Sequence, residues 1–166
     1  MVTATHTQPH RADHDLGRDS DHNTTHDTVS LFYVVPADQL VPDLHPRLGA
    51  FRSGEHVFAT GYLVGLLEAP CLTYLRRRAR AGQAPVGTRV KVEHRAPSIP
   101  GNRLHVTARC TVEDRSRFVF AVAARDQHGL LVADGHVTTH LVDTTTFRAR
   151  LRHRARDRPH LTDTSR

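Results

Sequence analysis

Cysteine, lysine and long apolar runs are scarce in this chain of 166 residues. Its two cysteines, Cys71 and Cys110, fall within apolar patterns, which favours reduced, buried thiols over a disulfide or a metal framework. No apolar run approaches the roughly 20 residues that span a bilayer. The N-terminus lacks the basic-then-apolar pattern of an export signal. We therefore expect a cytoplasmic protein without a membrane partner.

Positive charge is abundant but unevenly distributed. The net charge is +6, and Lys91 is the only lysine. Residues 144–166 carry seven arginines against two aspartates, whereas residues 1–29 carry five aspartates against two arginines. A nucleic-acid-binding domain would organise its basic residues over a folded face. Because most of the excess lies in a terminal segment, nucleic acid is not the expected partner.

The composition divides the chain into three segments. Residues 1–28 are polar and rich in His, Asp and Thr, which predicts a disordered tail. Histidines recur there every four residues, but no apolar face supports the helix that would let them hold a metal, so no metal site is expected. Residues 29–147 form one domain with a core. Residues 148–166 predict an Arg-rich, solvated tail.

One segment of the domain has helical periodicity. The helix is expected from Thr60, as its N-cap, to about Arg80, with a bend near Pro70 because proline removes one helical hydrogen bond. The apolar residues that recur at helical spacing are Leu63, Leu66, Leu67, Cys71 and Leu75.

The remaining apolar residues alternate with polar ones, as in strands that have one buried face. The predicted strands cover residues 29–35, 90–94, 104–112, 118–124 and 130–142, and residues 37–48 suit an irregular or short helical segment. One helix followed by a run of antiparallel strands predicts an α+β fold. The helix is apolar enough to be wrapped by the sheet, as in a hotdog fold.

Three polar residues stand where apolar ones are expected: Thr60 at the helix start, Glu68 inside the helix and His94 on the apolar face of a strand. A hydroxyl, a carboxylate and an imidazole suit acyl transfer. The N–H groups of the helix start would stabilise an oxyanion. Each residue also has an ordinary structural explanation, as a cap, a solvated carboxylate or a buried histidine. Spacing alone leaves both the catalytic and the structural explanation of these three residues open.

Two motifs resemble those of the fluoroacetyl-CoA thioesterase family, which are hotdog-fold acyl-CoA thioesterases. They are VFATGYLVGLLE at residues 57–68 and VGTRVKVEH at residues 86–94. The resemblance extends over roughly residues 30–150. It implies thioester hydrolysis in which Glu68 attacks the acyl carbonyl or activates water, His94 acts as general acid and base, and Thr60 positions the substrate. It also implies that the backbone of Gly87 contacts the substrate.

The same resemblance implies a homodimer with sites near the subunit interface, and no cofactor other than the CoA that the substrate carries. Gly54 and Phe58 are expected to line the substrate site. Two positions depart from the family pattern: Gly54 stands where the fluoroacetate-specific enzyme has a phenylalanine gate, and Thr139 where it has an arginine that contacts ligand. We therefore expect a larger acyl group rather than fluoroacetyl selectivity.

Two alternatives stay open. Three consecutive arginines, Arg76, Arg77 and Arg78, follow the apolar part of the helix. They would contact either the phosphates of CoA or the acidic surface of an acyl-carrier protein. The structural alternative is that they are only a solvent-exposed helix end. A thioesterase acting on acyl-carrier-protein thioesters is therefore the second hypothesis. The third is a non-catalytic hotdog protein that binds an acyl ligand or a protein partner, although a binder does not need a buried Glu–His pair.

Overall fold

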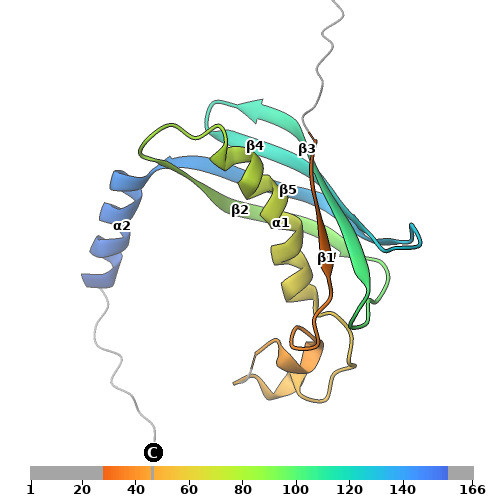
Figure 1. Cartoon of the computed structure of the whole chain (residues 1–166). Helices are drawn as coiled ribbons and strands as arrows, with labels where there is room; N and C mark the ends of the chain where they lie inside the picture. The colour runs from red at the N-terminus through yellow and green to blue at the C-terminus, as the bar shows by residue number, and fades with distance from the viewer. Residues whose placement is uncertain (1–27, 46, 157–166) are drawn as a thin grey trace, which may run out of the picture.

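A computed structural model describes residues 28–45 and 47–156. Within them, a five-stranded antiparallel sheet curves around one long helix, α1 (Thr60–Arg76), as Figure 1 shows. The strand order is β1-β3-β4-β5-β2. The strands are β1 (Thr28–Val34), β2 (Gln83–His94), β3 (Arg103–Asp114), β4 (Arg117–Arg125) and β5 (Leu131–Asp143). This arrangement confirms the predicted α+β fold.

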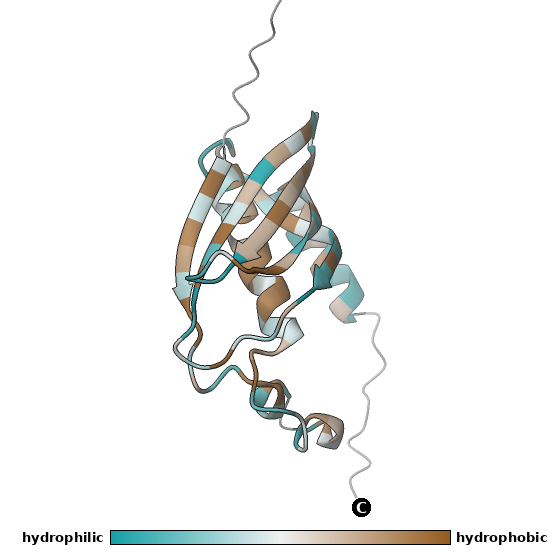
Figure 2. Ribbon diagram, turned by 90° about the vertical axis from the view of Figure 1, so that its right-hand side faces the viewer, coloured by the Kyte–Doolittle hydropathy of each residue, from teal (hydrophilic) through white to brown (hydrophobic). Residues whose placement is uncertain are grey.

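The hydrophobic core lies between α1 and the inner face of the sheet. Leu63, Leu67 and Leu75 of α1 are completely buried there. Tyr74 meets Phe120 of β4 edge-on, with ring centroids 5.2 Å apart. Buried residues alternate with less buried ones along β3 and β4, and the matching change of hydropathy along the strands is visible in Figure 2. Burial of this apolar surface is the main force that holds α1 against the sheet.

The start of α1 differs from the prediction by one residue. Ala59 is the N-cap and Thr60 is the first helical residue, and no side chain caps the helix. The Thr60 hydroxyl contacts His94 instead of a backbone N–H group of its own helix. A polar interaction with β2 has therefore replaced the local one that the sequence suggested.

The end of α1 also comes earlier than predicted. The helix continues through Pro70 and ends at Arg76 rather than near Arg80. The backbone N–H groups of Arg78 and Ala79 both turn back to the carbonyl of Leu75, which closes the last turn. The arginines after α1 consequently lie in a loop and not on the helix.

Strand β2 is an edge strand and is longer than predicted. It begins at Gln83 and includes Pro85, which an edge strand tolerates because proline has no N–H to donate. Its pairing with β5 shifts between Gly87 and Arg89. Val90, predicted on the apolar face, is 38% exposed. The core of the domain therefore covers the second half of β2 incompletely.

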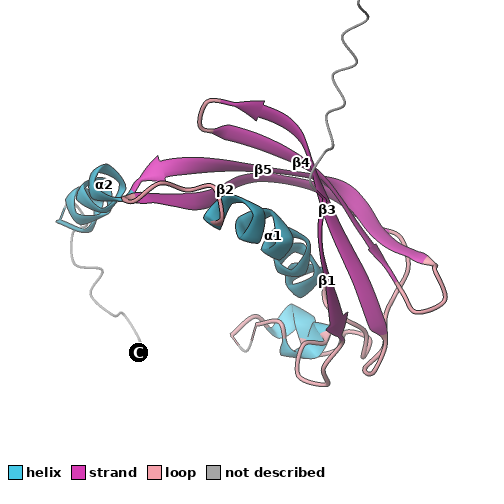
Figure 3. Ribbon diagram, turned by 45° about the horizontal axis from the view of Figure 1, so that its top comes forward, coloured by secondary structure: helices cyan, strands magenta, loops and turns pink. Residues whose placement is uncertain are grey.

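A helix, α2 (Thr144–Arg156), occupies the segment for which a solvated tail was predicted. The Asp143 side chain accepts a 2.7 Å hydrogen bond from the Thr146 N–H, and the Thr144 N–H bonds the Gly82 carbonyl at 2.8 Å. Local capping, rather than apolar periodicity, thus starts this helix. None of its residues is buried, and Figure 1 and Figure 3 show it projecting away from α1.

The segment between β1 and α1 contains two short 3₁₀ helices, η1 (Val41–Asp43) and η2 (Gly49–Phe51). The first lies within residues 37–48, for which an irregular or short helical segment was predicted, and the second follows that range. They lie beside the N-terminal end of α1, where the Tyr62 hydroxyl donates a 3.3 Å hydrogen bond to the carbonyl of Asp43.

The expectations for the two ends of the chain cannot be compared with the structure. Those for residues 1–27, including disorder and the absence of a metal site, and for residues 157–166 fall outside the described residues. Among the residues described, no helix is both long and apolar enough to cross a membrane.

Candidate active site

Thr60 and His94 meet at the N-terminal end of α1. Thr60 Oγ1 lies 3.0 Å from His94 Nδ1, which joins the first residue of α1 to the last residue of β2. His94 Nε2 is buried and has no hydrogen-bond partner within the described ranges. The two residues line an open pocket of about 340 Å³ together with Arg95, Ala96 and Pro97. A buried imidazole nitrogen without a protein partner can exchange a proton only with a group that reaches it, such as a bound ligand.

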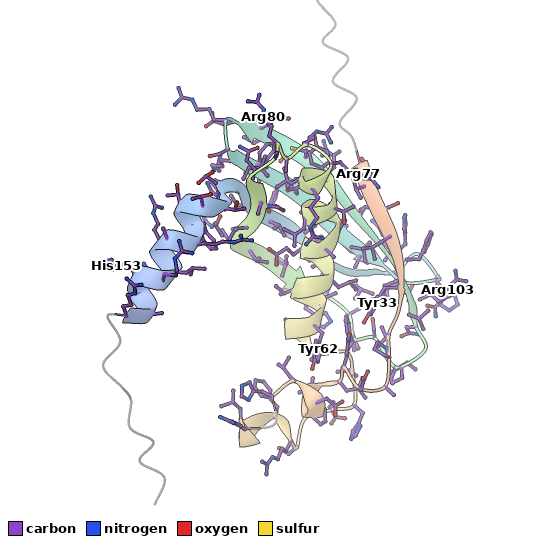
Figure 4. The ribbon with its side chains drawn as sticks, turned by 60° about the vertical axis from the view of Figure 1, so that its left-hand side comes forward. Tyr33, Tyr62, Arg77, Arg80, Arg103 and His153 are labelled. Carbon is purple, nitrogen blue, oxygen red and sulfur yellow. The ribbon has the colours of Figure 1, made fainter. Side chains whose placement is uncertain are left out.

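The backbone at the start of α1 adds hydrogen-bond donors to this pocket. The first intrahelical bond runs from the Leu63 N–H to the Ala59 carbonyl at 3.0 Å. The helix itself therefore does not use the N–H groups of residues 60–62. Together with the positive end of the helix dipole, they favour negative charge on a bound oxygen. Figure 4 shows Tyr62 at this end of the helix.

Glu68 approaches a different part of β2. Its side chain is partly buried, and its carboxylate lies against the backbone of Gly87. A Cβ atom added to Gly87 would overlap Oε1 of Glu68 and would stand 2.8 Å from its Cδ. Glycine at position 87 is therefore required for the observed position of the carboxylate.

Cys71 lies one helical turn beyond Glu68, but its thiol is not a competing nucleophile. Burial, together with the negative charge of Glu68, raises the pKa of Cys71 to about 12. The thiol is fully buried and stays protonated near neutral pH. Of these two neighbours, only Glu68 offers a nucleophile or a base.

Within one chain, the Thr60–His94 pair and the Glu68–Gly87 pair lie apart from each other. Thr60 and Glu68 are about 12 Å apart along the helix axis. Gly87 and His94 are about 23 Å apart along β2. The structure thus brings Thr60 to His94 and Glu68 to Gly87, but it does not join the three predicted catalytic residues in a single chain.

Thr139 on β5 is a polar residue whose place in the site only the structure reveals. It is completely buried, and its Oγ1 has no hydrogen-bond partner in the part of the chain that is described. It pairs with Gly87 on one side and with Phe118 on the other. The sequence marked this position only as a departure from the family pattern. The structural signal is a buried, unpaired hydroxyl next to the glycine that faces Glu68.

The two residues predicted to line the substrate site beside Gly87 have structural roles here. Phe58 is fully buried in the core of the chain and packs near Tyr33, with ring centroids 6.0 Å apart. Gly54 packs against Val41, and an added Cβ would clash with Val41 Cγ1 and lie 3.1 Å from the carbonyl oxygen of Phe51. An aromatic gate at position 54 would require η1 to move.

Arg95 carries the charge closest to the Thr60–His94 pocket. It hydrogen-bonds Asp134 through Nε and lies 3.0 Å from Glu93. The hydrogen bond from Arg95 lowers the pKa of Asp134, and the same contact raises the pKa of Arg95. The carboxylates of Asp134 and Glu93 therefore balance the positive charge of the Arg95 guanidinium. Over the described ranges, no group of three His, Cys, Asp or Glu side chains is placed to hold a metal ion.

Comparison with known proteins gives consistent matches. The family model described as fluoroacetyl-CoA-specific thioesterase matches residues 45–145. The fluoroacetyl-CoA thioesterase of Streptantibioticus cattleyicolor is 34% identical over 102 residues, which cover 61% of this chain and 70% of that protein.

Solved structures match over a larger part of the chain. A solved structure of a fluoroacetyl-CoA thioesterase superposes with a TM-score of 0.74 at 28% identity, covering 80% of this chain and 96% of that one. A Thermus thermophilus thioesterase superfamily member superposes with a TM-score of 0.71 at 22% identity over 80% of this chain and 95% of that one. These matches confirm the predicted hotdog architecture.

Proposed function

Because this chain belongs to the fluoroacetyl-CoA-specific thioesterase family, we propose that it hydrolyses an acyl-CoA thioester to a free acid and CoA. The observation that carries the proposal is the 3.0 Å contact between Thr60 Oγ1 and His94 Nδ1, which leaves the buried Nε2 of His94 without a partner in the described part of the chain. A histidine held through one nitrogen and free at the other is suited to proton transfer.

In the proposed reaction, Glu68 either attacks the acyl carbonyl carbon or removes a proton from a water molecule that attacks it. The C–S bond then breaks, and His94 supplies the proton that the CoA sulfur takes up. In the first case the resulting acyl–Glu68 anhydride is then cleaved by water, which gives the free acid and restores the carboxylate. Thr60 orients the imidazole, and the N–H groups at the start of α1 stabilise the oxyanion. CoA enters as part of the substrate, and the reaction needs no other cofactor.

A homodimer is part of the proposal. Glu68 lies about 12 Å along the helix from the Thr60–His94 pair of its own chain. A second copy would supply the missing residue if the carboxylate of one chain meets the Thr60–His94 pair of the other. Among the described strands, β2 has a neighbour on one side only. This open edge and the exposed side chain of Val90 support an interface on this side of the sheet.

The acyl preference is proposed to be broader than fluoroacetyl. Position 54 has no side chain, and its contact with Val41 leaves no room for an aromatic one without rearrangement. Initial rates with fluoroacetyl-CoA, acetyl-CoA and longer acyl-CoA esters test this directly. A strong preference for fluoroacetyl-CoA over acetyl-CoA would contradict it.

Acyl-carrier-protein thioesters are the second candidate substrates. The arginines that follow α1 favour this candidate, because carrier proteins with an acidic surface would complement them. We also infer a cytoplasmic location, which the two free, buried cysteines support because thiols persist in reducing compartments.

The central test compares site variants with matched controls elsewhere on the chain. Glu68→Gln and His94→Ala are each expected to lower kcat/KM at least about a hundredfold, as read by the release of free thiol from acyl-CoA. Glu55→Gln and His136→Ala change the same residue types at exposed positions and should keep wild-type turnover. Near-wild-type rates in both site variants would exclude the proposed mechanism.

A further inference from the structure

A second pocket lies beyond the C-terminal end of α1, away from the Thr60–His94 pair. Its volume is about 430 Å³. The lining residues come from the loop after α1, the β3–β4 hairpin and the neighbouring strands: Arg78, Arg80, Gln83, Glu113, Arg115, Ser116, Phe118 and Leu141. The pocket thus combines a polar, charged rim with an apolar floor.

Arginine dominates the rim of this pocket. Arg78, Arg80 and Arg115 face a single carboxylate, that of Glu113, so the rim carries an excess of positive charge. The guanidinium of Arg78 lies 3.7 Å from the centre of the Tyr74 ring, a contact that holds it in place. Figure 4 shows Arg77 and Arg80 gathered at this end of the molecule. Guanidinium groups in such a cluster are suited to bind phosphate.

Arg115 occupies an unusual backbone position. Its φ is 52°, and it is the only non-glycine residue with positive φ in the described part of the chain. It lies in the turn between β3 and β4, where a positive φ favours glycine. An arginine that persists in a conformation suited to glycine points to a use for its side chain.

One row of residues across the sheet connects this pocket to Glu68. Phe118, in the pocket floor, pairs with Thr139, and Thr139 pairs with Gly87, against which the Glu68 carboxylate lies. Two strand spacings separate Phe118 from Gly87, or about 10 Å. The buried, unpaired hydroxyl of Thr139 lies in the middle of this row.

We propose that the pocket formed by Arg78, Arg80 and Arg115 binds the phosphate end of a phosphopantetheine thioester, with Thr139 in the row of residues between this pocket and Glu68. The inference rests on the proposed thioesterase function and names the part of the substrate that the pocket recognises. The phosphate belongs either to CoA or to a phosphopantetheine group on a carrier protein. In both cases the ligand is an organic phosphate joined to a thioester by an extended arm.

The test uses Arg115→Gly, which removes the guanidinium and suits the turn, so the variant is expected to fold. With acetyl-CoA its KM should rise about tenfold, whereas with the acetyl ester of pantetheine, which lacks phosphate, KM should change less than twofold. Arg80→Ala should behave in the same way. Arg109→Ala removes an exposed arginine on the outer face of β3 and serves as the matched control.

Calorimetric titration with CoA separates this inference from the proposed activity, because binding requires no hydrolysis. The dissociation constant for CoA should rise about tenfold in Arg115→Gly. If the wild type binds CoA in this way but hydrolyses no thioester, the phosphate pocket stands and the proposed function fails. Equal CoA affinity in both proteins, no CoA binding by the wild type, or equal KM changes with both esters would overturn the inference.

Acyl-carrier thioesters identify the source of the phosphate. If the rise in KM of Arg115→Gly is confined to CoA esters, the pocket binds the nucleotide phosphates of CoA. If KM rises equally with carrier-protein thioesters, the pocket binds the phosphodiester next to pantetheine. Both results support phosphate recognition by these arginines.

Discussion

Replacing Gly87 by alanine would test the role of Glu68 with the addition of one methyl group. The new Cβ would overlap Glu68 Oε1, and its nearest other contacts are also atoms of the Glu68 side chain. Because a glutamate side chain can adopt another rotamer, the carboxylate is expected to move while the backbone stays in place. A shifted rotamer costs about 1 kcal/mol, and alanine gains about 0.5–1 kcal/mol over glycine within a strand.

The expected result is therefore a separation of stability from activity. The melting temperature of Gly87→Ala should stay close to that of the wild type. Its kcat/KM for acyl-CoA should fall about a hundredfold, or about 2.7 kcal/mol of transition-state stabilisation, because a displacement of about 1 Å is enough for such a loss. Thermal unfolding followed by circular dichroism and thiol-release kinetics measure the two quantities.

Two further variants make the result decisive. Gly49→Ala is the control, because an added Cβ at Gly49 meets no atom within 4 Å, and it should leave both quantities unchanged. Adding Gly87→Ala to Glu68→Gln should cost little more activity, since both changes remove the same carboxylate. Wild-type turnover in Gly87→Ala would show that the observed position of Glu68 is not the one that catalysis uses.

Two predictions concern groups with shifted pKa values. Since burial beside Glu68 raises the pKa of Cys71 to about 12, iodoacetamide at pH 8 should label Cys71 only after denaturation, as read by mass spectrometry, and rapid labelling of the native protein would contradict this. The hydrogen bond from Arg95 lowers the pKa of Asp134 from 3.8, so its stabilising effect is present above that pH and is lost as pH falls through the lowered value. Asp134→Asn should therefore lower the melting temperature at pH 7, and the difference from the wild type should shrink in acid; a difference independent of pH would refute the ion-pair explanation.

Much of the fold was predictable from local patterns. The apolar spacing around Leu63 and Leu67 predicts α1, because the apolar residues that recur at helical spacing are the ones that the core buries. Alternation along residues 104–112 and 118–124 predicts β3 and β4 for the same reason. The helix at residues 144–156 escaped prediction because a capping carboxylate starts it and no apolar face accompanies it.

The candidate site was predictable only in part. Residue types and motifs identified Thr60, Glu68 and His94 as candidate catalytic residues, since a hydroxyl, a carboxylate and an imidazole are unusual among apolar neighbours. Their mutual distances were not predictable, because they depend on how β2 crosses α1. Phe58 illustrates the limit: it lies inside a motif, yet the packing of the core buries it completely.

The α+β class, the helix that carries a hydroxyl and a carboxylate, and the family all follow from the amino-acid sequence, because each depends on residue type and spacing along the chain. The contact of Thr60 with His94, the approach of Glu68 to Gly87 and the separation of these two pairs in one chain follow only from the folded arrangement. This arrangement also joins arginines from two distant segments, the loop after α1 and the β3–β4 turn, into one pocket. The physical reason is that sheet register and helix packing set distances between residues that are remote in sequence, and no local pattern encodes them.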